Sequence, residues 1–398
     1  KPLVNASAAL DAFNRLSGHG LSGSTSINWT ELIEFKNSFT NGIPDKERKD
    51  LAERGIDFIQ GQAHFVDRQV IEIDGTRHSA GKILIATGMV PRPLGFDGAD
   101  LTTTSDEFLE LTDLPERIVF VGAGYVTMEL AQVAARAGAT VDIVEMTDRP
   151  LQPFDSDLVE LLVEDCRELG IRFHFGSCVD QIERTDEGLV ACCSENGQTY
   201  AADLVVHGAG RVPSLHGMDL EAADIAVEDG AVAVNKYLQS TTNPAVYAAG
   251  DCSATAGKPL TPVANLEADV VAHNLVEGNS TTPDYTGVPS AVFTTPSLAA
   301  VGMLEDQARE HPEVDLDIRF QRVDDQKEMQ QLGIRRAAYK LLVDKATDRL
   351  LGAHLYGPAA HDTVNLAATA IRLDISTERL GRVIFTYPTL TGSLGWML

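Results

Sequence analysis

Two glycines separated by one residue, Gly122 and Gly124, follow an apolar run that begins at Ile118. A stretch of helical length and a second apolar run, which ends at Glu145, come next. Apolar β-branched runs without polar alternation are typical of parallel strands buried on both faces. The first glycine permits a tight turn, and the second lets a pyrophosphate approach the backbone at a helix N-terminus, where free N–H groups and the helix dipole favour an anion. The pattern therefore predicts a dinucleotide site.

The residue that ends the second apolar run indicates which dinucleotide binds. Glu145 follows the glycines by about twenty residues, where a carboxylate accepts hydrogen bonds from the adenosine ribose and repels a 2′-phosphate. This favours NAD over NADP. Arg149 is close enough in sequence to weaken that preference, although an exposed arginine at a helix start is an alternative interpretation. Thr127 takes the third fingerprint position, where Gly or Ala is usual, so we expect the helix to lie slightly further from its strand.

Small residues also follow other apolar runs. One run ends at Ala86, Thr87 and Gly88, and another ends at Gly250 and Asp251. Strands that end in small residues let a flat ligand or another backbone come close. A carboxylate in such a place is expected to bind a sugar or sugar-alcohol hydroxyl; the alternative is that Asp251 caps the following helix.

Composition narrows the class of protein. The chain has 398 residues, a length that predicts about two or three soluble domains. Its formal net charge is −26. Such a surface is a poor partner for nucleic acid or anionic membranes, because phosphate binding needs clustered cations, and no apolar run is long enough to cross a membrane. The cysteines show no disulfide or zinc spacing, which indicates a reducing, cytoplasmic compartment. Neighbours in a strand point to opposite faces and cannot easily bridge, so the adjacent pair Cys192-Cys193 is expected to be buried structural thiols and not a redox pair. The cysteines are Cys166, Cys178, Cys192, Cys193 and Cys252.

Hydrophobic periodicity places these sites among predicted helices and strands. The predicted elements, in chain order, are helices over residues 5–16 and 29–55, strands over 56–73 and 82–88, a linker around 104–115, a helix near 158–162, strands over 171–206, strands at 291–293 and 339–343, and a helix over 364–373. Strands followed by a helix after residue 285 predict an α+β module appended to a doubly wound part.

Several segments together resemble the pyridine nucleotide-disulfide oxidoreductases, the family of glutathione reductase, dihydrolipoamide dehydrogenase and mercuric reductase. The matching segments are Ala86–Gly88, Gly122–Tyr125 with Glu129, Gly210–Pro213, Gly250–Asp251, Leu260–Ala264 and Phe293–Pro296. Their order and spacing cover almost the whole chain.

The resemblance implies an α/β homodimeric flavoprotein that uses FAD and NAD. It would have two Rossmann-like nucleotide-binding domains, the first truncated at its N-terminus and split around the second, and a C-terminal α+β dimerisation domain. The expected boundaries are 1–105 and 237–284 for the FAD domain, 106–236 for the NAD domain and 285–398 for the dimerisation domain.

The resemblance also assigns roles to individual residues. Asp251 would hold the ribitol or pyrophosphate region of FAD, Thr261 would lie near the pyrimidine edge of the flavin, Tyr125 would cover the nicotinamide pocket, and Glu129 would pair with a lysine beside the flavin. The full set of candidate cofactor-binding residues is Ala86, Thr87, Gly88, Gly122, Gly124, Tyr125, Glu145, Gly210, Arg211, Gly250, Asp251, Thr261 and Pro262, and the candidate catalytic residues are Glu129 and Tyr387.

The start of the chain departs from the family pattern. Lys1 looks like the last residue of the family's Pro-Lys-Lys or Pro-Ser-Lys triplet. We therefore expect the FAD fingerprint and the Cys-x-x-x-x-Cys redox pair to lie upstream of Lys1. The lysine partner of Glu129 would lie there too, unless it is Lys1 itself.

The second departure lies near the end of the chain. The family's His-Pro-Thr-x-x-Glu run is replaced by Tyr387-Pro388-Thr389-Leu390-Thr391-Gly392. Tyrosine, with a pKa of roughly 10, is a poor base at neutral pH, and Gly392 has no side chain to orient it. This argues against glutathione-type or lipoamide-type turnover; alternatively, Tyr387 packs at the dimer seam. We also expect a cis peptide bond between Tyr387 and Pro388.

Two hypotheses follow. In the first, the protein passes hydride from NAD(P)H to FAD and then to a disulfide or another small acceptor, such as a quinone or a dye. In the second, it is a catalytically incomplete, dimeric nucleotide-binding protein that serves as a sensor or scaffold. The histidines support no metal site, since His207, His354 and His361 lie in or beside predicted core elements without ligand spacing.

Overall fold

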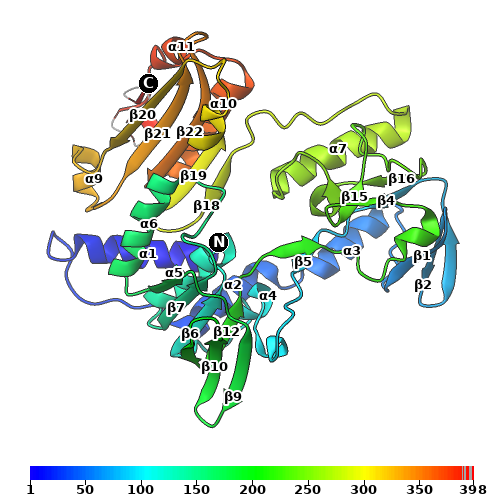
Figure 1. Ribbon diagram of the computed structural model, residues 1–398, viewed down its shortest axis with the longest axis horizontal. Helices are drawn as coiled ribbons and strands as arrows, with labels where there is room; N and C mark the ends of the chain where they lie inside the picture. Colours follow the sequence, from blue (N-terminus) through cyan, green and yellow to red (C-terminus); the bar gives the residue numbers. More distant parts are fainter. Residues whose placement is uncertain (388, 390, 394–396) are drawn as a thin grey trace. The chain divides into compact units, whose positions relative to one another are not determined.

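The computed structural model describes residues 1–387, 389, 391–393, 397 and 398 (Figure 1). The chain forms two compact units, each built from segments distant in the sequence. The first unit comprises Lys1–Thr40, Pro93–Gly210 and Pro289–Leu398, and the second comprises Asn41–Arg92 and Arg211–Val288. The finer boundaries expected from the family stay a prediction.

A four-stranded parallel sheet forms the centre of the first unit. Its strand order is β12 (Leu204–His207), β6 (Arg117–Val121), β7 (Thr140–Glu145) and β8 (Arg172–Phe175). Residues 118–120 of β6 are almost completely buried, as expected for a parallel strand with covered faces. Helix α5 (Tyr125–Arg136) connects β6 to β7, which confirms the predicted strand–helix–strand unit.

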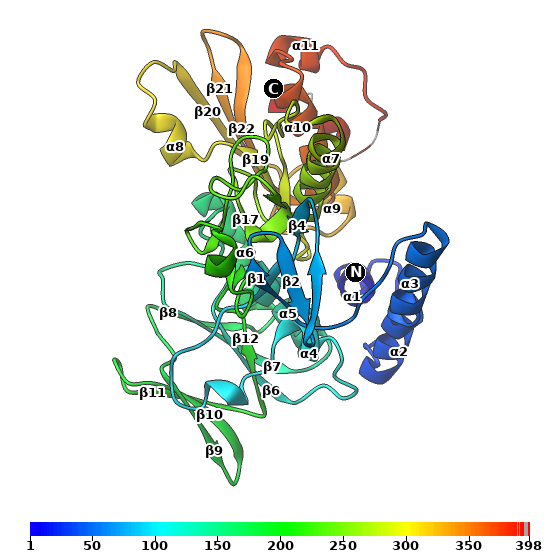
Figure 2. The ribbon, with the colours of Figure 1, turned by 90° about the vertical axis from the view of Figure 1, so that its right-hand side faces the viewer.

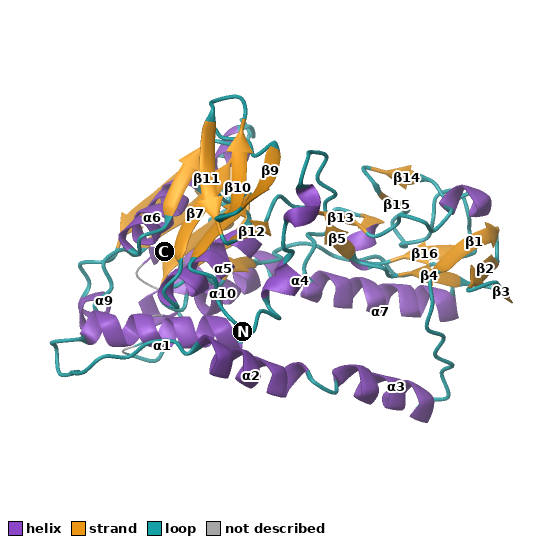
Figure 3. Cartoon of the chain, turned by 90° about the horizontal axis from the view of Figure 1, so that it is seen from below, coloured by secondary structure: helices purple, strands orange, loops and turns teal. Residues whose placement is uncertain are grey.

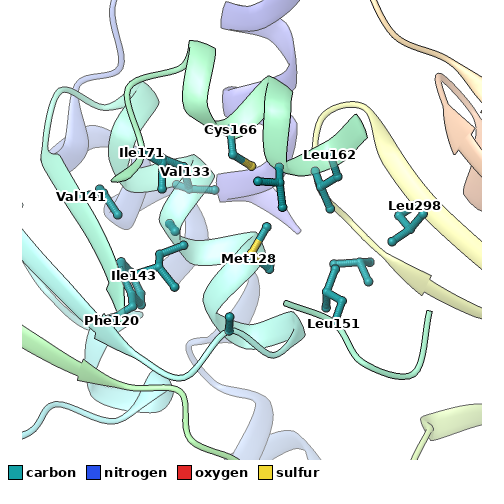
Figure 4. Packing of buried hydrophobic residues seen from close by; sticks show 14 of the residues in the cluster. Phe120, Met128, Val133, Val141, Ile143, Leu151, Leu162, Cys166, Ile171 and Leu298 are labelled. Atoms are coloured by element: carbon teal, nitrogen blue, oxygen red, sulfur yellow. The ribbon is translucent and has the colours of Figure 1, made fainter. Parts of the chain in front are cut away.

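Helices cover this sheet and close its core. Helix α6 (Ser156–Glu168) places Leu162 and Cys166 against Met128 of α5 and against Phe120 and Ile143 of the sheet (Figure 4). Helix α1 (Pro2–Leu16) packs on α5, and α2 (Trp29–Thr40) packs on α1. The predicted N-terminal helices are therefore present, and part of their apolar surface completes the core of this unit.

The predicted run of strands over 171–206 includes a separate antiparallel sheet (Figure 2). It consists of β9 (Gln181–Thr185), β10 (Gly188–Cys193) and β11 (Gln198–Ala202). Neighbouring residues of β10 face opposite sides of this sheet, so Cys193 is buried and Cys192 only partly buried. The expected burial of this adjacent pair is therefore confirmed for Cys193 and only partial for Cys192, and Cys178, in the loop before β9, is exposed.

The expected linker around 104–115 contains a short helix. Helix α4 (Ser105–Phe108) begins at Thr104, whose side chain and that of Glu107 form a capping box. Phe108 is completely buried and contacts Trp29 edge to face. Phe108 therefore anchors this segment to the core, although the polar composition of the segment predicted a linker.

The C-terminal part of the first unit is a five-stranded antiparallel sheet covered by helix α10 (Ala360–Arg372). Its strand order is β18 (Ser290–Val292), β19 (Ser297–Gly302), β22 (Arg349–Gly357), β21 (Ala338–Asp344) and β20 (Leu316–Arg322), and the short helices α8 (Glu305–Arg309), α9 (Lys327–Gln331) and α11 (Thr377–Gly381) flank it. This is the α+β module that the sequence predicted.

The second unit is organised around a pair of parallel strands, β4 (Ile83–Ile85) and β16 (Val246–Ala248). Helix α7 (Thr261–Glu277) lies along this pair (Figure 3) and packs Val270 and Val271 against Tyr247. The remaining elements are α3 (Ile43–Glu53), the antiparallel strands β1 (Ala63–Asp67), β2 (Val70–Ile73) and β3 (Thr76–Ser79), the pair β5 (Met89–Pro91) and β13 (Arg211–Pro213), and the strands β14 (Val227–Glu228), β15 (Ala231–Ala233) and β17 (Ser253–Ala254).

Two strand expectations in this unit need correction. Strands were expected from residue 56, but the first strand begins at Ala63, and Phe58 and Ile59 are exposed. The strand that ends before Ala86 was expected to be buried, yet Leu84 on β4 is 42% exposed. Both expectations rested on apolar composition alone, which does not show whether a strand is covered on both faces. In this unit the face of β4 that carries Leu84 is open.

Candidate functional site

The two fingerprint glycines have different surroundings. Gly122 has φ +90°, and a Cβ on it would lie 2.6 Å from the carbonyl oxygen of Gly208, so the turn after β6 requires glycine. Gly124 is the N-cap of α5 and has ordinary backbone angles. The nearest atom to a Cβ on Gly124 is 3.8 Å away. The fold therefore does not need glycine at 124, and the absence of a side chain leaves space beside the N-terminus of α5.

Glu145 ties the end of β7 to this turn. Its Oε2 accepts a hydrogen bond from the backbone N–H of Ala123 at 2.7 Å. Its Oε1 accepts hydrogen bonds from the backbone N–H and the hydroxyl of Thr147, each at 2.8 Å. The predicted ribose-binding carboxylate thus lies directly beside the glycine turn, with its position fixed from both sides.

Arg149 is bound to its own loop. Its guanidinium donates hydrogen bonds to the carbonyl oxygens of Leu151 at 3.3 Å, Gln152 at 3.1 Å and Phe154 at 3.2 Å. These bonds hold the cation against backbone acceptors. Arg149 is therefore not positioned as a mobile cation waiting for a 2′-phosphate.

The side chain of Thr127 is accommodated by a glycine on another segment. Thr127 is completely buried in the first turns of α5. A Cβ on Gly208, which follows β12, would overlap Thr127 Oγ1. The larger residue was expected to move the helix outward, and the space it needs is provided by a glycine that is distant in the sequence.

The other candidate residues of this unit lie around the same edge of the sheet or on its helix. Tyr125, in the first turn of α5, is 41% exposed, and Gly210 has φ +100°. His207 is buried and its Nδ1 accepts a hydrogen bond from the backbone N–H of Ala209 at 3.1 Å, which fits the structural role expected for this histidine.

Glu129 lies next to the start of the chain. It accepts a hydrogen bond from the backbone N–H of Phe293 at 2.9 Å, and the ammonium group of Lys1 lies over the Phe293 ring. Partial burial lowers the pKa of the Lys1 ammonium, and the carboxylate of Glu129 opposes that shift. Lys1 is therefore close enough to Glu129 to be influenced by its charge, and the assignment of Lys1 as its partner stays a prediction.

The second unit gathers the remaining candidates where β4 and β16 end. These parallel strands terminate at the same edge, where the N–H of Ala249 donates to the carbonyl oxygen of Ile85 at 3.1 Å. Ala86 and Thr87 are exposed beyond β4. Gly88 has φ +65°, and no atom lies within 4 Å of a Cβ built on it. This edge is open and lined by small residues.

A cavity of about 500 Å³ lies beside that edge. Gly250, Asp251, Arg211 and Lys258 line it, and Arg211 also donates a hydrogen bond to the carbonyl oxygen of Met89 at 2.6 Å. Thr261 and Pro262 form the exposed first turn of α7. The donors, the carboxylate and the small residues of the cavity fit a phosphorylated sugar alcohol such as that of FAD.

Two residues of this cavity were missed from the sequence. Lys258 lies in a loop between motifs, and Glu267 occupies a helix position that looked like any acidic residue of α7. One usable signal was that Glu267, three residues after the Leu260–Ala264 segment, interrupts the apolar positions Val263, Val270 and Val271 of α7. The partners of Glu267 are far from it in sequence, so the signal was incomplete.

Tyr387 is 82% exposed and, with Gln321 and Phe385, lines a cavity of about 780 Å³ in the first unit. The backbone N–H of Gly392 donates to Thr389 Oγ1 at 2.9 Å. Pro388 lies outside the described residues, so the expected cis bond after Tyr387 stays a prediction.

The described ranges contain no group of three or more His, Cys, Asp or Glu residues arranged to hold a metal ion. Within the same ranges, every helix is too short or too polar to span a membrane.

Comparison with known proteins shows which family has this architecture. A family model described as pyridine nucleotide-disulphide oxidoreductase matches residues 25–268, and the model of that family's dimerisation domain matches residues 288–398. Mercuric reductase of Staphylococcus aureus is 30% identical over 383 residues, which cover 94% of this chain and 69% of that protein. Glutathione reductase of Burkholderia cepacia is 30% identical over 392 residues, which cover 98% of this chain and 86% of that protein.

A solved structure agrees with these sequence matches. The HOCl-induced flavoprotein disulfide reductase RclA from Escherichia coli aligns with a TM-score of 0.86 and 26% identity, over 99% of this chain and 88% of that chain. The two nucleotide-binding parts and the C-terminal dimerisation domain expected from the sequence are thereby confirmed as the fold class. The chain belongs to the pyridine nucleotide-disulfide oxidoreductases, a family of FAD-dependent enzymes that use NAD(P)H.

Proposed function

We propose that this protein takes reducing equivalents from NADH and passes them, by way of FAD, to a disulfide or another small oxidant. The observation that supports this most directly is the open N-terminus of α5, where Gly124 leaves space that the fold does not use. When bound, FAD supplies the two-electron chemistry that links the nicotinamide to the acceptor. Membership of an enzyme family favours this function over the sensor or scaffold hypothesis.

The glycine turn of the first unit is the proposed NAD site. Gly122 shapes the turn, and the first N–H groups of α5 face the space beside Gly124. Those N–H groups and the helix dipole would hold the pyrophosphate without a cationic side chain. Tyr125, exposed in the first turn, would cover the nicotinamide, and Gly210 would border the same site.

Charge at the end of β7 is the basis for proposing NADH rather than NADPH. Glu145 is held in place by Ala123 and Thr147, so its carboxylate would meet the ribose hydroxyls and repel a 2′-phosphate. A cation is needed to accept that phosphate, and Arg149 is bound to four backbone carbonyls instead.

The edge beyond β4 and β16 is the proposed FAD site. Ala86, Thr87, Gly88 and Gly250 would let the cofactor approach the backbone. Asp251 would accept hydrogen bonds from ribitol or phosphate-linked hydroxyls. Arg211 lines the same cavity and would supply positive charge, and Thr261 and Pro262 would present the N-terminus of α7 to the electron-rich edge of the flavin.

Glu129 and Tyr387 are the proposed residues of the reaction itself. Glu129 would hold a lysine ammonium in place, and Lys1 is the cation that the structure brings near it. Tyr387 would stand at the position of the family's histidine. Because a phenol is a poor base at neutral pH, we propose that the preferred acceptor takes its protons from solvent and not from Tyr387, as a quinone or a dye can.

The setting of the enzyme is also proposed. The match to a dimerisation-domain model supports a homodimer. The net charge of −26 disfavours nucleic acid and anionic membranes as partners. The free cysteines of the described chain support a cytoplasmic location.

An anaerobic titration tests this function. The FAD-loaded protein should lose its flavin absorbance on addition of NADH and regain it when the right acceptor is added. Glutathione disulfide, lipoamide, a quinone and a dye would be compared as acceptors under the same conditions. Flavin absorbance that NADH leaves unchanged, in protein shown to contain FAD, would contradict the proposal.

A further inference from the structure

The carboxylate of Glu267 lies at the centre of a hydrogen-bond cluster in the second unit. The residue is 1% exposed. Its Oε2 accepts a hydrogen bond from the backbone N–H of Gly250 at 2.6 Å. Its Oε1 accepts hydrogen bonds from the hydroxyls of Thr255 at 2.9 Å and Tyr285 at 2.6 Å. Burial of a carboxylate is costly unless such bonds replace those to water. The burial of Glu267 therefore depends on these donors.

The neighbouring residues leave little freedom around this carboxylate. A Cβ on Gly257 would lie 2.7 Å from Val263, 2.8 Å from the ring of Tyr285 and 3.1 Å from Glu267 Oε1. Burial raises the pKa of Tyr285, and its hydrogen bond to Glu267 raises it further, so the phenol remains a proton donor at neutral pH. The backbone N–H of Gly250 and the hydroxyls of Thr255 and Tyr285 thus surround one buried carboxylate.

The cluster fixes the turn that carries Asp251. Strand β16 ends at Ala248, and Gly250 has φ +74°, so the chain leaves the sheet just before this aspartate. Ser253 Oγ donates to the carbonyl oxygen of Gly250 at 2.7 Å, while the N–H of Gly250 is held by Glu267. Both polar groups of the Gly250 backbone are therefore bound within the turn and its supporting helix.

We propose that Glu267 is a positioning residue for FAD, which acts by holding the Gly250–Asp251 turn in the conformation that presents Asp251 to the cofactor. Glu267 and Asp251 line the same cavity of about 500 Å³. The inference rests on the proposed role of Asp251 in FAD binding. It adds that a buried carboxylate seventeen positions along the chain from Gly250 sets the geometry of that contact.

Variants of the FAD-loaded protein test this role, with the Kd of FAD measured by equilibrium dialysis and the Tm measured separately. Glu267→Met keeps a similar volume but leaves the N–H of Gly250 without its acceptor, which should raise the Kd about tenfold. Glu267→Gln retains one acceptor oxygen and should restore most of the affinity. Asp269→Asn, an exposed change on the same helix, should leave the Kd unchanged.

A double-mutant cycle separates positioning from stability. Asp251→Asn alone should raise the Kd. In the double variant with Glu267→Met the two fold-changes should not multiply, because both act on one contact. If Glu267→Met proves too unstable to handle, Tyr285→Phe removes one donor from the cluster and should raise the Kd about fivefold.

Different failures have different meanings. A Glu267→Met protein, or in its place a Tyr285→Phe protein, with a lowered Tm but a wild-type Kd would reduce the cluster to a structural role and overturn the inference. Fold-changes that multiply in the double variant would also overturn it, since Glu267 would then not act through Asp251. An unchanged Kd in Asp251→Asn alone would instead overturn the proposed FAD-binding role of Asp251.

Discussion

The hydroxyl group of Thr127 fills the space that Gly208 leaves open. Thr127 is completely buried in α5, and Gly208 follows the neighbouring strand β12. A Cβ on Gly208 would overlap Thr127 Oγ1. Among the described residues, this hydroxyl has no hydrogen-bond partner, so the pair is maintained by shape and not by a polar contact.

We expect Gly208→Ala to destabilise the protein by about 1–3 kcal/mol, the usual cost of overpacking a close-packed core. The double variant Thr127→Ala/Gly208→Ala should recover much of that loss, because the clashing oxygen is gone. Urea unfolding of both variants measures the effect. Thr127→Ala is the control and should change stability by about 1 kcal/mol or less, since the lost packing of its buried methyl group is offset by removal of an unpaired hydroxyl. Equal stability of Gly208→Ala and the wild type would show that the two residues do not compete for space.

The two fingerprint glycines should respond differently to alanine. Gly124→Ala should leave the Tm nearly unchanged, because its Cβ meets no atom closer than 3.8 Å, but should raise the Kd of NADH about tenfold by occupying the space for the pyrophosphate. Gly122→Ala should lower the Tm, since its φ of +90° and its contact with Gly208 both oppose a side chain. Tight NADH binding by Gly124→Ala would count against the proposed NAD site.

Removal of the charge at Glu145 should reduce the discrimination between nucleotides. Glu145→Gln keeps acceptor and donor groups near Ala123 and Thr147 but no longer repels a 2′-phosphate. The ratio of kcat/KM for NADH to that for NADPH should fall about tenfold. Asp148→Asn, an exposed change three residues after Glu145 at a side chain without a bond to the glycine turn, is the matched control and should change the ratio less. A ratio that Glu145→Gln leaves at the wild-type value would refute the assignment.

Local patterns were sufficient to predict the elements that hold the dinucleotide site. The apolar run before Gly122, the helical stretch and the acidic end at Glu145 are contiguous, and each has a local physical cause. For the same reason, the helix at α1 and the C-terminal α+β module were predicted with their approximate ranges.

Residues whose role depends on distant partners were not predicted. Glu267 is buried because Gly250, Thr255 and Tyr285 donate to it, and nothing in the periodicity of α7 encodes that contact. The exposure of Leu84 likewise depends on what covers the second face of β4 and not on its own apolar type.

Lys340 provides a prediction about stability and pH. Its ammonium group is buried on β21 and lies 2.8 Å from Asp155, 2.6 Å from Asp157 and 2.9 Å from Glu305. Lys340→Met would leave these carboxylates near each other without their shared cation, which should cost about 3–5 kcal/mol at neutral pH. The control is Lys345→Met, which breaks an exposed pair and should cost less than about 1 kcal/mol.

The difference in unfolding free energy between the wild type and Lys340→Met should depend on pH in a defined way. Burial lowers the pKa of Lys340, but the hydrogen bonds to its carboxylate partners outweigh burial and raise the pKa overall. The stability that protonated Lys340 contributes is therefore complete below the ordinary pKa of Lys and is lost only as the pH rises through the raised value. The hydrogen bond from Lys340 lowers the pKa of Glu305. The stability that ionised Glu305 contributes is therefore complete above the ordinary pKa of Glu and is lost as the pH falls through the lowered value. The difference should therefore be constant from about pH 5 to pH 10 and shrink in acid. Protonated carboxyl groups no longer need the cation, so the difference in unfolding free energy must decrease in acid if this network causes it. A difference that grows as the pH falls below 4 would exclude the network as its source.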